Sequence, residues 1–130
     1  MNALPLIGRI LFSMIFIMSG LNHFMKLDMM TGMASQAGVP VPGASVIIAG
    51  IIIILGGLSV LLGYKAKIGA VLLFIFLILA SFMVHDFWNY PEDQTMQQMI
   101  SFMKNLSMAG GTLIIYYFGS GPMSLSDDDE

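Results

Sequence analysis

The 130-residue chain contains no cysteine, and only 10% of its residues are charged. Without cysteine it cannot form disulfides, bind metals through thiolates or attach haem covalently. Five basic residues against eight acidic ones leave a net charge of −3, which argues against a nucleic-acid-binding surface. The chain also lacks a glycine-rich phosphate loop and an H-E-x-x-H sequence. A self-contained hydrolase is therefore disfavoured, and any redox role would need a bound cofactor or a partner.

Apolar residues make up 57% of the chain, and they gather into four long runs. An ordinary soluble domain has roughly 45–50% apolar and about 25% charged residues, so this composition favours a membrane protein. Each run has the roughly 17–25 residues that a helix needs to cross a bilayer, and helices satisfy their own backbone groups in lipid. We predict an all-α, four-transmembrane-helix bundle with helices at about 4–24, 44–63, 68–84 and 97–118.

The segments between the runs are short. Residues 26–43 contain several glycine and proline breakers together with methionines, so we expect a loop that could dip into the membrane interface as a short helix. Residues 64–67 join the second and third helices so tightly that these helices must be antiparallel neighbours. Residues 85–94 form a polar and aromatic connection that Pro91 interrupts.

An even number of spans places both termini on one side of the membrane. Basic residues in short loops favour the cytoplasmic side. The side with the termini carries Arg9, Lys65 and Lys67, whereas the loops opposite carry Lys26. We therefore expect cytoplasmic termini, one transmembrane domain over residues 1–121 and an acidic, flexible tail over residues 122–130.

Small residues indicate where helices approach each other closely. The second predicted helix contains four glycines and a small-x-x-x-small pair at Ser59 and Gly63, and the fourth contains two adjacent glycines. Packing within one bundle is the simplest explanation, and a homo-oligomer stays open. The glycines are Gly50, Gly56, Gly57 and Gly63 in the second helix and Gly110 and Gly111 in the fourth.

Polar side chains gather at one predicted membrane face. Lys104 and Asn105 lie inside the fourth run, where a charge costs roughly 2.5–3.5 kcal/mol on insertion scales, so we expect them to face the bundle interior. His85 and Asp86 end the third run at the same face, where Asp86 could be the counter-ion of Lys104. Trp88 would belong to an aromatic lid over them.

The end of the first run adds three polar residues, which lie on one helical stripe at i, i+3 and i+4. The predicted pocket or ligand-binding set is Ser19, Asn22, His23, His85, Asp86, Trp88, Lys104 and Asn105. An alternative stays open, in which Lys104 snorkels to the headgroups, Trp88 is an interfacial residue and the cluster only anchors helices. No metal site is predicted, because the two histidines lack metal-ligand spacing on one helix.

Arg9 lies near the opposite, cytoplasmic end of the first run. We expect it to act as an anchor there. It could snorkel to lipid phosphates, or it could bond carbonyl groups near the end of the fourth helix.

Four short motifs follow one another along the chain: Gly8-Arg9, FxxSG at residues 16–20, HDFW at 85–88 and FxKNL at 102–106. Over nearly the whole chain this ordered set resembles the DoxX family of small four-helix membrane proteins. The resemblance implies an inner-membrane protein. Some members are similar to the small subunit of an archaeal thiosulfate:quinone oxidoreductase, and others associate with membrane oxidoreductase complexes. The motif match extends to Arg9, Ser19, Gly20, His85, Asp86, Lys104 and Asn105.

Two functions are therefore expected. The first is an accessory or quinone-facing subunit of a membrane oxidoreductase system, in which Lys104 or a histidine hydrogen-bonds a quinone carbonyl and Asp86 sets its protonation state. The second is a non-catalytic scaffold whose polar cluster fixes helix packing and whose outer loop docks a partner. The expected partners are the lipid bilayer and oxidoreductase proteins or quinone. The lack of cysteine argues against autonomous sulfur redox chemistry.

Overall fold

The computed structural model describes residues 2–125, which fold into helices without any strand. In order these are α1 (Ala3–Met25), α2 (Leu27–Gln36), α3 (Pro42–Leu62), α4 (Ala66–Met83), the short 3-10 helix η1 (Phe87–Asn89) and α5 (Glu92–Phe118). Within this part of the chain α1, α3 and the segment Ala66–Asn89 are long and apolar enough to cross a membrane. The predicted helical membrane bundle is confirmed, with three such spans and the more polar α5 beside them.

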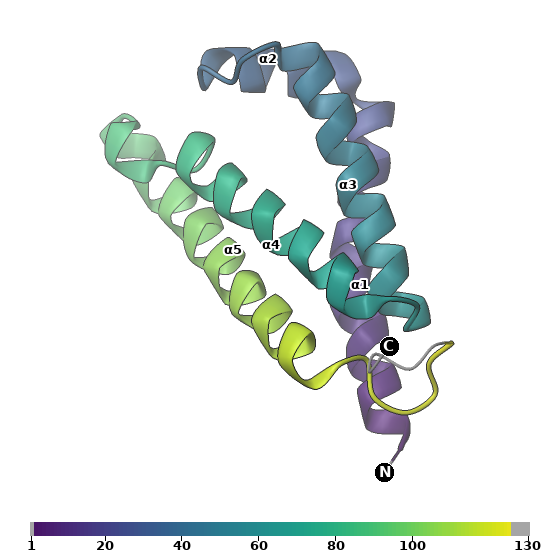
Figure 1. Ribbon diagram of the computed structural model, residues 1–130. Coiled ribbons are helices and arrows are strands. Elements are labelled where there is room, and N and C mark those ends of the chain that lie inside the picture. The colour runs from purple at the N-terminus through teal and green to yellow at the C-terminus, as the bar shows by residue number, and fades with distance from the viewer. Residues whose placement is uncertain (1, 126–130) are drawn as a thin grey trace.

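Two elements differ from the simplest expectation. Residues 27–36 form α2, the short helix that was one alternative for the first connection, and it lies across the end of α3 (Figure 1). Helix α5 begins at Glu92 and not near residue 97, because Pro91 occupies its N-cap and two acidic residues lie in its first turn. Proline supplies a helix-compatible φ, and negative charge favours a helix N-terminus.

The long helices form two pairs. Helix α1 packs along α3, α4 packs along α5, and contacts between α3 and α4 join the pairs. Figure 1 shows the pairs meeting near the two termini and diverging toward α2 and η1. We call the end with the α3–α4 turn and the start of α1 the closed end, and the end with α2 and η1 the open end. The backbones of α1 and α5 do not contact each other.

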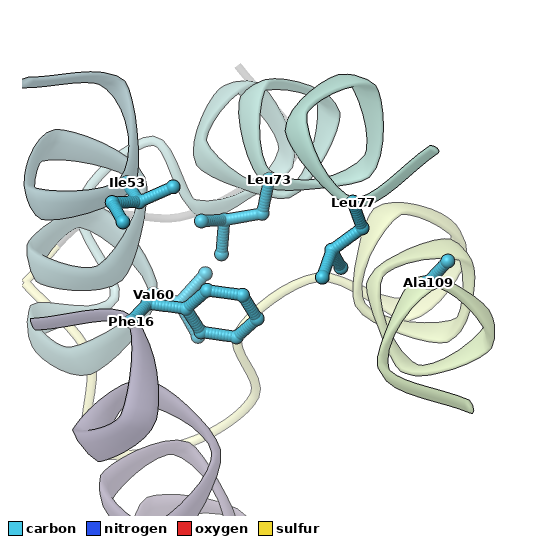
Figure 2. Packing of buried hydrophobic residues seen from close by; sticks show 6 residues of the cluster. All are labelled: Phe16, Ile53, Val60, Leu73, Leu77 and Ala109. Carbon is cyan, nitrogen blue, oxygen red and sulfur yellow. The ribbon is translucent and has the colours of Figure 1, made fainter. Parts of the chain in front are cut away.

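The hydrophobic core lies where the two pairs meet. Side chains from α1, α3, α4 and α5 converge there (Figure 2). Ile53, Val60 and Leu73 are completely buried, and they bring α3 and α4 together. The cluster consists of Phe16, Ile53, Val60, Leu73, Leu77 and Ala109.

The glycines of α3 allow this close packing, as predicted. A Cβ atom on Gly56 would lie 2.8 Å from Leu73 Cγ and 3.1 Å from the carbonyl oxygen of Gly69. For α5 the prediction is right at one glycine and wrong at the other. A Cβ on Gly111 would lie 3.1 Å from the Phe12 ring, whereas one on Gly110 would meet nothing within 4 Å. Adjacent residues of a helix point about 100° apart, so only one of the pair can face α1.

Candidate functional site

His85 and Asp86 lie in the turn between α4 and η1, where both are half-buried. His85 Nδ1 lies 2.8 Å from Gln98 Oε1 of α5. An amide oxygen only accepts, so this pairing needs the proton on Nδ1 and leaves Nε2 of the neutral ring as an acceptor. Asp86 Oδ2 accepts a hydrogen bond from Asn89 Nδ2 at 2.9 Å. The turn is thus tied both to α5 and to η1.

An aromatic cluster holds η1 against α5. Its centre is Phe102, which is 8% exposed. Ring centroids of Phe82, Phe87 and Trp88 lie 5.2, 5.5 and 5.7 Å from that of Phe102, all in edge-on arrangements. Such pairs are favourable beyond the area they bury. Trp88, predicted as part of a lid, is the most exposed member, and its outer face is free for another molecule.

Tyr90 follows η1 and lies just outside the apolar segment. Its hydroxyl donates to the Val84 carbonyl at 2.6 Å. Burial, and secondly the nearby charge of Asp86, raise the pKa of Tyr90 above its ordinary value of 10.0. Tyr90 is therefore a neutral donor at physiological pH, and it closes the turn that presents His85.

Lys104 does not face the core, because it is exposed, and within residues 2–125 no ion pair joins it to Asp86. Asn105 is half-buried and lies on the same face of α5 as the buried Ala109 and Thr112, four and seven residues further along. Lys104 belongs to an exposed stripe that we call the polar face of α5. Its residues fall within less than half of the helix circumference at 3.6 residues per turn. Its polar members are Asp93, Gln97, Lys104 and Ser107, and the exposed Ile100 lies among them.

A packing contact orients this polar face. Gly111 meets the Phe12 ring of α1. Lys104 precedes Gly111 by two helical turns, so it lies on the same, α1-facing side of α5. From Gly111 toward Lys104 the helix runs toward η1, the direction in which the helix pairs diverge (Figure 1). The polar face of α5 therefore lines the side on which the two pairs separate.

The polar residues of α1 lie on the other pair. His23 is 6% exposed, its Nδ1 donates to the Ser19 carbonyl at 2.7 Å, and its ring meets Phe76 edge-on at 6.2 Å. Ser19 is half-buried and Asn22 is exposed. None of their described hydrogen bonds reaches α5 or η1. The structure thus divides the predicted set into an α1 group and an α4–α5 group, and a single pocket stays a prediction.

Arg9 lies at the closed end and is only 5% exposed. Its NH1 atom donates to the carbonyls of Ser120 (2.6 Å) and Pro122 (3.2 Å), and NH2 donates to that of Met123 (2.6 Å). Of the two alternatives, the geometry matches bonding to carbonyls after the last helix. The same segment returns to α3, where the Leu125 amide donates to the Leu62 carbonyl at 3.1 Å. Residues 126–130 of the expected acidic tail lie outside the described residues.

Gln98 completes the turn, but the sequence reasoning left it out of the site. Pro91 was the signal that could have identified Gln98. A helix that begins directly after Pro91 places Gln98 in its first two turns, beside the end of α4. Within the described part of the chain, no group of three histidine or acidic side chains is close enough to hold a metal ion.

A model of the DoxX family matches residues 4–86. The inner membrane protein YphA of Escherichia coli is 31% identical over 122 residues, which cover 94% of this chain and 87% of that protein. The chain belongs to the DoxX family. A Surfeit locus protein 4 homolog of Schizosaccharomyces pombe is 31% identical over 70 residues, 52% of this chain and 22% of that protein. No solved structure matches.

Membership in the DoxX family confirms the resemblance that the motifs indicated. Together with helices apolar enough to cross a bilayer, it makes the chain an integral protein of the bacterial inner membrane. The family match includes Arg9, His85 and Asp86, whereas Lys104 and Asn105 lie beyond its end at residue 86.

Proposed function

We propose that this DoxX-family protein is an accessory, quinone-facing subunit of a membrane oxidoreductase system. The supporting observation is the polar face of α5, whose Lys104 is exposed on the side where the helix pairs diverge. A charged side chain at membrane depth is costly and usually faces a partner or a functional cavity. The polar face is therefore where a quinone or a partner helix would bind.

The side chains at this end suit a quinone. Lys104 offers an ammonium group that can donate to a quinone carbonyl. His85, with its Nδ1 proton on Gln98, keeps Nε2 as an acceptor for a quinol hydroxyl. Trp88 adds an exposed aromatic face. The redox centre itself would belong to a partner protein, and the oxidoreductase part of this proposal draws on the resemblance noted in the sequence.

Purification in lipid nanodiscs, followed by organic extraction and mass spectrometry, tests this function. We expect stoichiometric quinone in the natural protein, or saturable uptake when quinone is added. Lys104→Met should reduce binding about tenfold or more, since hydrogen bonds to charged groups contribute about 1.5–3 kcal/mol. Lys26→Met is the matched control, because Lys26 is also exposed but lies at the start of α2 and not on α5. Folded protein that takes up no added quinone would rule the proposal out.

A non-catalytic scaffold is the second candidate. It is favoured by three buried polar side chains that are satisfied inside their own helices. His23 bonds the Ser19 carbonyl, Ser81 bonds that of Leu77 and Thr112 bonds that of Ala109. Such groups fix helix packing and need no ligand. In this case Lys104→Met would leave small-molecule binding unchanged, and Trp88→Ala would weaken assembly with a partner protein.

A further inference from the structure

Helix α2 connects two of the membrane-spanning candidates, α1 and α3, at the open end of the molecule (Figure 1). Helix α3 has 21 residues. At 1.5 Å per residue it is about 31 Å long, which matches a hydrocarbon core of about 30 Å, so its first turn lies close to the membrane boundary. Helix α2 packs on this turn, because the Thr31 methyl group lies 4.0 Å from the position of a Cβ atom on Gly43. Its depth is therefore that of the boundary between lipid and water.

One side of α2 is covered by the protein. Ala34 is 8% exposed. The half-buried Leu27, Met30 and Thr31 lie on the same side, within about a third of the helix circumference. Helix α2 packs on α3 and, with fewer contacts, on α1. The rest of its circumference is exposed, and the side chains there indicate which surroundings it suits.

The exposed part of α2 has an apolar side and a polar side. Met29 and Met33, four residues apart, are 55% and 50% exposed and lie on one line along the helix. Asp28 and Ser35, seven residues apart, are exposed on a second line. At about 100° per residue, the directions of Met33 and Ser35 differ by about 160°. We call the first pair the methionine side and the second pair the polar side. The exposed Gly32 and Gln36 lie between the two sides.

We propose that α2 is an interfacial helix, whose methionine side inserts among the acyl chains just below the headgroups and whose polar side faces water. Interfacial helices bury their apolar face about 5–10 Å into this region. Apolar surface that faces lipid already lies next to α2, because Met25 ends α1, is 78% exposed and precedes Met29 by four residues. The unbranched thioether side chains of methionine adapt to irregular surroundings such as acyl chains.

The charge before α2 agrees with this depth. Lys26 is exposed directly after α1, and a lysine at the end of a span extends its ammonium group toward the headgroups. The proposal does not depend on quinone binding, because α2 packs on α1 and α3, whereas Lys104 lies on α5.

The single tryptophan of the chain makes a local test straightforward. In a Trp88→Phe background, Met33→Trp puts the only indole on the methionine side, and Ser35→Trp is the matched variant on the polar side. Each protein is placed in nanodiscs of phosphatidylcholine brominated either near the headgroup or near the end of the acyl chain, and iodide is added to the water. We expect the Met33→Trp indole to be quenched more by the shallow bromine than by the deep bromine, and about threefold less by iodide than the Ser35→Trp indole.

Three results of this experiment would overturn the proposal. Equal quenching of the two indoles by iodide would place the methionine side in water. Protection of the Met33→Trp indole from both iodide and bromine would mean that a protein covers this side. Quenching of both indoles by bromine and of neither by iodide would place the polar side in the membrane.

A second measurement uses the natural tryptophan and no added indole. Met29→Gln combined with Met33→Gln keeps side-chain length and helix propensity but makes the methionine side polar. Hydrogen exchange of the α2 amides in nanodiscs should become about tenfold faster, because insertion in lipid no longer opposes local unfolding. Asp28→Asn, on the polar side, should leave the exchange unchanged. Unchanged exchange in the methionine variant would also overturn the proposal.

Discussion

The closed and open ends of the molecule satisfy their polar groups in different ways. At the closed end a buried arginine binds three backbone carbonyls from a segment more than a hundred residues away, and it fastens the segment that follows α5 to α1. At the open end the bonds of His85 and Asp86 reach only as far as Gln98 and Asn89, and Lys104 is exposed. Long-range contacts hold one end together, whereas the other keeps polar groups available.

This difference indicates that the closed end contributes most of the stability and that the open end offers a surface for binding. Glycine contacts and the core join the helix pairs toward the closed end, so most of the folding free energy should arise there. At the open end the aromatic cluster and the His85–Gln98 hydrogen bond keep η1 and its turn on α5, and the divergence of the pairs leaves the polar face of α5 uncovered. Stability and binding can therefore be changed separately by substitutions at the two ends.

The largest effect is expected from Arg9→Met. The change removes three hydrogen bonds from a charged donor and leaves the buried Ser120 carbonyl without this partner. Hydrogen bonds to charged groups contribute about 1.5–3 kcal/mol each, and they are not additive, so we expect a loss of about 3 kcal/mol or more. Unfolding in mixed micelles, followed by circular dichroism, measures it. Lys26→Met, the control, should change the free energy of unfolding by less than about 0.5 kcal/mol. Equal losses in both variants would show that the Arg9 hydrogen bonds do not stabilise the fold.

Gly56→Ala should have the next largest effect. The added methyl group would meet Leu73 and the Gly69 carbonyl, and overpacking of this kind costs about 1–3 kcal/mol. Gly110→Ala is its matched control, because nothing lies near that position and alanine is favoured in helices by about 1 kcal/mol. The same micelle titration should therefore show opposite signs for the two variants. A destabilised Gly110→Ala would mean that α5 has a neighbour at that position.

The parts of the fold that follow from hydrophobicity could be predicted from the sequence. Twenty-residue apolar runs become helices because lipid tolerates little else, and the tight connection at residues 64–67 determines which helices are neighbours. The start of α5 was harder, because it depends on local chemistry at Pro91 and Glu92 and not on the apolar pattern. The divergence of the two pairs arises from packing across four helices, which no single segment encodes.

The same reasoning applies to the candidate site. His85, Asp86 and Trp88 are adjacent in the chain, so any fold keeps them together. The direction of Lys104 could not be predicted, because helix periodicity alone does not say which side of α5 faces a neighbouring helix. Its orientation is determined by a tertiary contact, that of Phe12 with Gly111. His23 could be placed at the end of α1, but its partner there is a carbonyl of its own helix.

Phe102→Leu should act on the open end alone. Leucine fills most of the volume but loses edge-on contacts with three rings, each favourable by about 0.5–1.5 kcal/mol, and we expect a net loss of about 1–1.5 kcal/mol. Fluorescence of Trp88 reports this region directly, because it is the only tryptophan. The unfolding midpoint measured by Trp88 fluorescence should shift to a lower denaturant concentration. The midpoint measured by the helical circular-dichroism signal of the whole protein should shift less. Phe118→Leu is the control, because that side chain is 76% exposed, and it should shift neither the fluorescence midpoint nor the helical midpoint.

The smallest effect concerns Tyr90 and pH. Burial raises its pKa above 10.0, so the fold favours the neutral phenol. Stability from this group is fully present below pH 10.0 and is lost as the pH rises through the higher pKa of the folded state. Tyr90→Phe should cost about 0.5–1 kcal/mol at neutral pH, through the lost bond to Val84, and should remove this alkaline decline. Denaturant titrations of both proteins from neutral to strongly alkaline pH measure the difference. An identical decline in the two would assign it to other groups, and the turn that presents His85 would then not depend on a neutral Tyr90.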